Sequence, residues 1–272
     1  MGKASRSKSQ RRLVPSPAGG PSASPGWTRS AWLTPTRALL IGLVVALITA
    51  GALIGVSVAG SSSSSKPSAT TVTGALATDA LLHGIPQRGN VLGDPSAPAT
   101  LVEFGEPQCP ICGAWARETL PTVVRDYVRT GKLKIVFHGI SFIEPTKDSD
   151  RALAALAAAG AQGRQFQLLD LLYRNQGEEG TGWITDDRLR ALSDSVLGLD
   201  VGRMLDERSS DATKAQIRES ARAAAQVMGE HLRTPTFLAG RSGGQLSLMP
   251  VSTVDQLGPQ GFPQLLDQMT SR

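Results

Sequence analysis

The sequence predicts an α/β domain, and three features carry this prediction. Residues 99–104 form a short apolar run typical of a strand, residues 113–130 space their apolar side chains as a helix does, and residues 132–138 again have a strand pattern. Two strands joined by a helix make a βαβ unit, whose strands lie in one sheet. A helical stretch at about 150–229 separates this unit from a return to strand at 233–239. We therefore expect an all-helical insertion within an α/β domain.

The elements beyond the βαβ unit follow from capping residues and from the spacing of apolar side chains. Thr185 is a good N-cap residue, and it begins a run of helix formers that continues to Leu192. The domain should close with a strand that starts at Pro235, a short partner strand and a final helix. The expected ranges are 150–160, 165–175, 185–192 and 211–228 for the helices of the insertion, 233–239 and 245–249 for the strands, and 262–269 for the last helix.

The basic residues are concentrated near the N-terminus. The chain of 272 residues has 28 Lys and Arg against 23 Asp and Glu. Eight of the basic residues and none of the acidic ones precede residue 67, so the remainder has 28 − 8 = 20 basic against 23 acidic residues, a net charge of −3. A domain that binds nucleic acid carries its positive charge as a patch on the folded part. We therefore expect no nucleic acid partner.

Residues 38–60 contain no charged side chain and are long enough to span a bilayer as one helix. Their basic flank is N-terminal, and the positive-inside rule keeps that side in the cytoplasm. We expect a disordered basic cytoplasmic tail at 1–37, a transmembrane helix at 38–60, a flexible linker at 61–85 and an extracytoplasmic domain at 86–272. The predicted location is the cell membrane, with a single span. A cleaved signal peptide is the alternative, because the segment 57–59 resembles a cleavage site.

Cys109 and Cys112 are the only cysteines, and they lie where the first predicted strand passes into its helix. Unpaired backbone N–H groups at a helix N-terminus stabilise a thiolate and lower its pKa. A C-x-x-C pair at the turn of a βαβ unit predicts a thioredoxin-like fold with a redox function. The alternatives are a structural disulfide, which stabilises little when its loop is so short, and a metal site. We expect no metal, because a structural zinc site needs four ligands and the three histidines do not supply them.

Two separated motifs bracket the helical stretch: F-G-E-P-Q-C-P-I-C at 104–112 and T-P-T-F at 234–237. Together they resemble the DsbA-like thiol–disulfide oxidoreductases, in particular the membrane-anchored bacterial members with a thioredoxin fold. The resemblance extends over about residues 88–270. It implies a thioredoxin fold with an inserted all-helical subdomain, preceded by one transmembrane helix.

The resemblance also implies roles for individual residues. Cys109 corresponds to the exposed attacking thiol and Cys112 to the buried resolving thiol. Pro235 corresponds to a cis-proline, whose loop lets the backbone of Thr234 pair with an extended substrate. Glu103 resembles a buried acid that accepts or relays the Cys112 proton. Because side chains alternate between the faces of a strand, an outward-facing Glu103 is the alternative.

The function implied by the resemblance is disulfide formation in exported proteins, without a cofactor. Its redox partner would be a quinone-linked membrane protein of the DsbB or vitamin K epoxide reductase type. Pro110 and Ile111 separate the cysteines, so the His found there in the strongest oxidants of the family is missing, and the direction of electron flow stays open. The alternatives are a disulfide reductase or isomerase, for example in cytochrome c maturation, and a Cu(I)-binding protein that uses the two thiolates.

Overall fold

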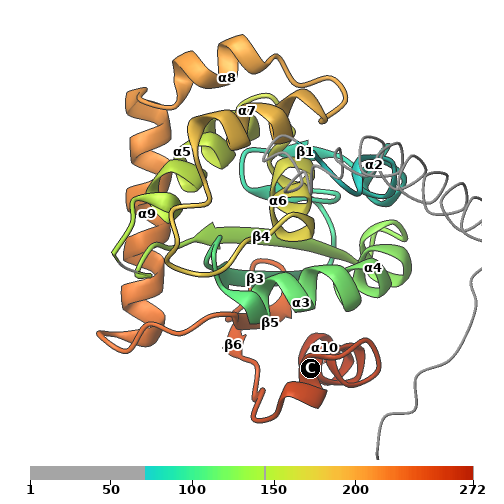
Figure 1. Cartoon of the computed structure of the whole chain (residues 1–272). Coiled ribbons are helices and arrows are strands. Elements are labelled where there is room, and N and C mark those ends of the chain that lie inside the picture. The colour runs from blue at the N-terminus through green and yellow to red at the C-terminus, as the bar shows by residue number, and fades with distance from the viewer. Residues whose placement is uncertain (1–70, 144, 272) are drawn as a thin grey trace, which may run out of the picture. The chain divides into compact units, whose positions relative to one another are not determined.

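The computed structural model describes residues 71–143 and 145–271, and its centre is a six-stranded sheet (Figure 1). The strand order is β1-β2-β4-β3-β5-β6. The strands β3 and β4 are parallel, whereas every other neighbouring pair is antiparallel. The expected βαβ unit is therefore confirmed and occupies the middle of the sheet. The strands are β1 (Gln87–Arg88), β2 (Val91–Leu92), β3 (Ala99–Gly105), β4 (Leu133–Gly139), β5 (Thr236–Arg241) and β6 (Ser247–Leu248).

Strand β3 is buried along its whole length because helices cover both of its faces. On one face, Val102 and Phe104 pack with Ala224 of helix α9 (Asp211–Met228). On the other face, Leu101 belongs to the main core, together with Trp115 of helix α3 (Pro110–Glu118). A strand covered on both sides is apolar throughout instead of alternating. This is the physical reason for the apolar run at 99–104.

The connection from β3 to β4 consists of three helical pieces, so the prediction of one helix at 113–130 is wrong. These pieces are α3, α4 (Leu120–Val123) and a π-helical turn, η1 (Val124–Val128). Helix α3 begins earlier than expected because Pro110 occupies its first position, where the missing N–H costs nothing. Pro121, in contrast, cannot donate to the carbonyl of Arg117 and interrupts the helical hydrogen bonds there.

Five helices lie between β4 and β5 and form the helical insertion. Thr185 caps α7 as expected, since its hydroxyl accepts the N–H of Arg188 at 3.1 Å. Helix α8 was not expected, because its seven residues are too few to show a helical period. In Figure 1 the helices α5 to α8 gather above the sheet, and α9 descends beside them toward the strands. The insertion comprises α5 (Asp148–Gly160), α6 (Gln165–Arg174), α7 (Asp186–Asp194), α8 (Val201–Glu207) and α9, and the domain closes with η2 (Val254–Leu257) and α10 (Gly261–Thr270).

The folded domain starts before residue 86, so the expected linker at 61–85 is too long. Helix α2 (Ala75–Leu82) packs on the insertion: Leu82 is buried in the main core, and the Thr78 hydroxyl donates to buried Asp170 of α6. The hairpin of β1 and β2 was also not predicted from the sequence. Its two-residue strands are too short to show alternation.

The predicted transmembrane segment at 38–60 and the basic tail at 1–37 lie outside the described residues. Within residues 71–143 and 145–271, no helix has the length and apolar character that crossing a bilayer requires.

Candidate active site

Cys109 is the N-cap residue of α3, and Cys112 lies one turn further along the same helix. The Cys109 sulfur accepts the backbone N–H of Cys112 at 3.4 Å. The thiol thus makes the N-capping hydrogen bond that a Ser or Asp side chain usually makes. Cys112 is fully buried, whereas Cys109 retains 7% of its exposure. The expected order of accessibility holds, but the attacking thiol is itself buried.

The two thiols differ strongly in acidity. The pKa of Cys109 is lowered to about 6, chiefly by the hydrogen bond from the Cys112 thiol, with further contributions from the Thr234 side chain and from the N–H groups of Cys112 and Ile111. Burial raises the pKa of Cys112 well above its ordinary range, and the hydrogen bond to Cys109 adds to this effect. At neutral pH the pair therefore consists of a thiolate at Cys109 and a thiol at Cys112.

The loop that precedes β5 forms the opposite side of the site. The peptide bond between Thr234 and Pro235 is cis, as the resemblance implied. The carbonyl oxygen of Thr234 lies 3.5 Å from the Cys109 sulfur and accepts its proton when Cys109 is in the thiol form. The backbone of this loop is thus close enough to Cys109 to contact whatever reaches the sulfur.

Glu103 points into the core beneath the cysteines and is only 3% exposed. Its neighbours across the sheet are Phe137 on β4 and Phe237 on β5, so apolar rings flank the carboxyl group. Its Oε1 atom has no hydrogen-bond partner, and burial, together with the nearby charge of Cys109, raises its pKa to about 8. The alternative of an outward-facing Glu103 is wrong, because neither face of β3 is open to solvent.

A second group of polar residues surrounds the active-site turn, and no role was predicted for them from the sequence. Glu106 is fully buried and accepts the N–H of Gln108 at 2.6 Å and the hydroxyl of Ser149. Gln108 donates to Ser149 at 2.8 Å and accepts the N–H of Gly180 at 3.0 Å. Gln176 donates to the carbonyl of Cys109 at 3.0 Å. The helical insertion therefore holds the turn that carries the reactive thiol.

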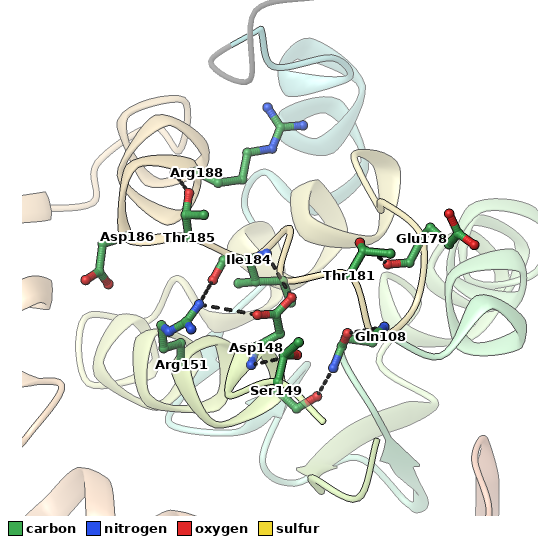
Figure 2. Close-up of polar contacts among 12 residues, drawn as sticks. Gln108, Asp148, Ser149, Arg151, Glu178, Thr181, Ile184, Thr185, Asp186 and Arg188 are labelled. Carbon is green, nitrogen blue, oxygen red and sulfur yellow. Dashed lines mark hydrogen bonds and ion pairs between the residues drawn. The ribbon is translucent and has the colours of Figure 1, made fainter. Parts of the chain in front are cut away.

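Figure 2 shows how the insertion is itself held in place beside Gln108. The carboxylate of Asp148, the first residue of α5, accepts the N–H of Ile184 at 3.1 Å and pairs with Arg151. Arg151 also donates to the carbonyl of Ile184. These bonds fix the end of the loop that contains Gly180. Short polar residues next to a C-x-x-C turn were the only available signal, and their partners lie 41 to 72 positions away in the chain.

The aromatic residues near the motif are core residues. Trp115 packs with Phe237 and Phe262 at ring-centroid distances of 4.9 and 5.4 Å, and Phe104 stacks on His138 on the other face of the sheet. In the part of the chain that the structure describes, no three His, Cys, Asp or Glu side chains gather as metal ligands.

Fold and site together define a thioredoxin-fold domain with a paired-cysteine site at a helix N-terminus. The thioredoxin family model matches residues 87–243, which is more than half of the chain, and the chain belongs to this family.

Several known proteins are similar to this chain. It is 36% identical over 103 residues to the probable disulfide bond formation protein D of Bacillus cereus, a match that covers 37% of this chain and 47% of that protein. It is 30% identical over 131 residues to the protein of the same name from Bacillus anthracis, covering 47% and 59%. The chain thus spans about half the length of the curated relatives it matches.

Among solved structures, oxidised BdbD from Bacillus subtilis superposes with a TM-score of 0.56 at 18% identity, covering 69% of this chain and 98% of that chain. The DsbA of Chlamydia trachomatis superposes with a TM-score of 0.52 at 22% identity, covering 66% and 90%. At these identities the likeness shows the shared fold.

Proposed function

We propose that this protein is a thiol–disulfide oxidoreductase that forms disulfides in exported proteins. The observation that carries the proposal is the pairing of an ionised Cys109 at the N-terminus of α3 with a buried, protonated Cys112, facing the backbone of the Thr234–Pro235 loop. The name of its relatives, disulfide bond formation protein D, supports the same activity.

In the forward direction, a substrate thiolate attacks the Cys109 sulfur of the Cys109–Cys112 disulfide. The disulfide breaks, a mixed disulfide forms between the substrate and Cys109, and Cys112 leaves as a thiolate that takes up a proton. A second substrate thiolate then attacks the substrate sulfur of the mixed disulfide, and Cys109 leaves. Two electrons have passed from the substrate to the cysteine pair. A low pKa makes Cys109 a good leaving group in this second step.

The acidity of Cys109 also supports the oxidising direction over the reducing one. A pKa of about 6 stabilises the reduced protein as a thiolate, and a stabilised reduced form makes the disulfide a stronger oxidant. The structure achieves this without a His between the cysteines, through the hydrogen bond from Cys112 and the N–H groups of α3. A reductase needs the opposite balance.

Glu103 supports the chemistry as a proton relay for Cys112: it is protonated at neutral pH and donates its proton when Cys112 leaves as a thiolate. It is buried in the same core, keeps its proton up to a pKa of about 8, and interacts electrostatically with both cysteines. We further propose that the segment 38–60 anchors the domain outside the membrane and that a quinone-linked membrane protein reoxidises it. The length and charge pattern of that segment support this placement.

The activity is tested by replacing Cys112 with Ser, which leaves the attacking thiol but removes the resolving one. Cells that produce Cys112→Ser should accumulate mixed disulfides between Cys109 and exported proteins, seen as thiol-sensitive adducts. The matched control is Cys109→Ser, which should form none. If both variants stay free of adducts, the proposed activity is wrong.

The direction of electron flow is tested by trapping thiols with an alkylating reagent in intact cells. An oxidase should be found mainly with the Cys109–Cys112 disulfide formed. A pair that is mainly reduced would contradict the oxidising direction while leaving the exchange activity intact.

A further inference from the structure

A second buried carboxyl group, that of Glu106, lies in the active-site turn between β3 and α3. The backbone carbonyl oxygen of Glu106 accepts the N–H of Cys109 at 3.0 Å, so the backbone of Glu106 is bound directly to that of the reactive cysteine. The same oxygen accepts the hydroxyl of Tyr173 at 3.3 Å. Glu106 is fully buried, so its carboxyl group must be satisfied by the protein.

The partners of this carboxyl group are neutral. Oε2 accepts the N–H of Gln108, and Oε1 accepts the hydroxyl of Ser149 at the start of α5. Within the described residues, no hydrogen bond or ion pair joins the Glu106 carboxylate to a Lys, Arg or His. The titratable and charged groups on the elements around it are Glu103 on β3, Cys109, Cys112, Arg117 and Glu118 on α3, Asp148, Asp150 and Arg151 on α5, and Asp170, Tyr173 and Arg174 on α6. A buried carboxylate without a cation is sensitive to any other negative charge nearby.

Ser149 allows this carboxyl group to exist in both protonation states. The Ser149 oxygen accepts the side-chain N–H of Gln108 and has one more lone pair available. When Glu106 is ionised, Ser149 donates its proton to Oε1. When Glu106 is protonated, the same hydrogen bond can reverse, with Oε1 donating to Ser149. The bonds to Gln108 persist in both states, so the turn is not disrupted by the change.

We propose that Glu106 takes up a proton when the Cys109–Cys112 disulfide is reduced, so that the site keeps its net charge. In the oxidised protein the site has one negative charge, on Glu106. On reduction, two substrate thiols lose two electrons and two protons and become a disulfide. The two electrons break the Cys109–Cys112 bond; one proton goes to Cys112 and the other to Glu106, and the negative charge moves to the Cys109 thiolate.

The role of Glu106 is therefore different from that of Glu103. Glu103 has an unpartnered Oε1 in an apolar environment and interacts with the Cys112 proton, whereas Glu106 is hydrogen-bonded and offsets the charge on Cys109. Burial and the charge of Cys109 raise the pKa of Glu106 to about 7, while its hydrogen bonds lower it. That value lies close to the pH at which the protein would work, as the exchange of a proton requires.

The inference rests on the proposed exchange activity and is tested by Glu106→Gln. Glutamine keeps an acceptor for the N–H of Gln108 and a donor for Ser149, but it cannot take up a proton. The equilibrium of each protein with reduced and oxidised glutathione is measured from pH 6 to 7.5. When the reduced enzyme takes up both protons that the two glutathione thiols release, the equilibrium constant for reduction of its disulfide is independent of pH. Each proton that the enzyme fails to take up makes this equilibrium constant rise about tenfold per pH unit.

Wild type should show only a few-fold rise per pH unit, and Glu106→Gln should approach tenfold, because it takes up only the Cys112 proton. Glu118→Gln is the matched control: it makes the same change at an exposed carboxyl group of α3, so its slope should stay like that of wild type. Equal slopes for wild type and Glu106→Gln would overturn the inference while the exchange itself remained. Failure of the wild-type protein to equilibrate with glutathione would instead overturn the proposed activity.

A second measurement avoids any dependence on the folding of the variant. The carbon resonance of the Glu106 carboxyl group is titrated by NMR in oxidised and in reduced wild-type protein. We expect the midpoint of the titration to lie at higher pH in the reduced protein. Identical midpoints in the two redox states would overturn the inference.

Discussion

The hydrogen bond from the Cys112 thiol is the largest single cause of the low pKa of Cys109, and it can be removed by Cys112→Ala. A hydrogen bond to a charged group contributes ~1.5–3 kcal/mol, and one pKa unit corresponds to about 1.4 kcal/mol. The pKa of Cys109 should therefore rise from about 6 to ~7–8 in the alanine variant. At pH 6.5 the thiolate fraction should then fall from about three quarters to less than one quarter.

The assay is the rate of alkylation of Cys109 by iodoacetamide as a function of pH, together with the ultraviolet absorbance of the thiolate. Cys112→Ser keeps a hydroxyl donor and should change the pKa less than Cys112→Ala does. Ile111→Ala is the matched control, because it removes a side chain between the cysteines and leaves every hydrogen bond in place. A pKa that stays at about 6 in Cys112→Ala would refute the reasoning and would assign the effect to the backbone N–H groups of α3.

Two further predictions concern stability. Folded Glu103 keeps its proton up to a pKa of about 8, whereas in the unfolded chain it ionises near 4.5, so its contribution to the free energy of unfolding becomes unfavourable as the pH rises between these values. In denaturant titrations, the free energy of unfolding of Glu103→Gln should therefore equal that of wild type near pH 4 and be ~3 kcal/mol larger at pH 7. A difference that does not depend on pH would contradict this account. Thr78→Val removes the hydroxyl that donates to buried Asp170 and should lower the free energy of unfolding by ~1–3 kcal/mol. Leu76→Ala, on the same helix but 87% exposed, should change it by less than ~0.5 kcal/mol, and equal effects of the two would mean that α2 is not part of the cooperative domain.

The helical insertion shows which predictions the sequence could support. Helices such as α6 and α9 were predicted close to their observed bounds because they are long enough to show a period, and α7 because Thr185 is a good cap. Helix α8 and the hairpin of β1 and β2 were missed because they are short. The helical break at Pro121 could have been predicted from the proline alone, but the apolar spacing across it was regular enough to suggest one helix.

The residues of the candidate site also fall into two groups, those predicted from the sequence and those found only in the structure. Cys109 and Cys112 were identified from their local motif at a strand-to-helix junction, and Glu103 and the Thr234–Pro235 loop from the family resemblance. Glu106, Gln108 and Gln176 were not, since their importance depends on partners that are distant in the chain. Ser149 illustrates this: it is an ordinary N-terminal helix residue until the fold places it against Glu106 and Gln108.

The amino-acid sequence alone determined the position of the cysteine pair at a strand-to-helix junction, because that position follows from local patterns of apolar and helix-capping residues. It also determined that the helical insertion lies between two strands of one sheet. Only the tertiary structure decided the acidity of the two thiols, the burial of Glu103 between Phe137 and Phe237, and the hydrogen bonds that hold Glu106. The physical reason is that desolvation and hydrogen bonding are set by groups that approach in space, and sequence spacing does not record that approach.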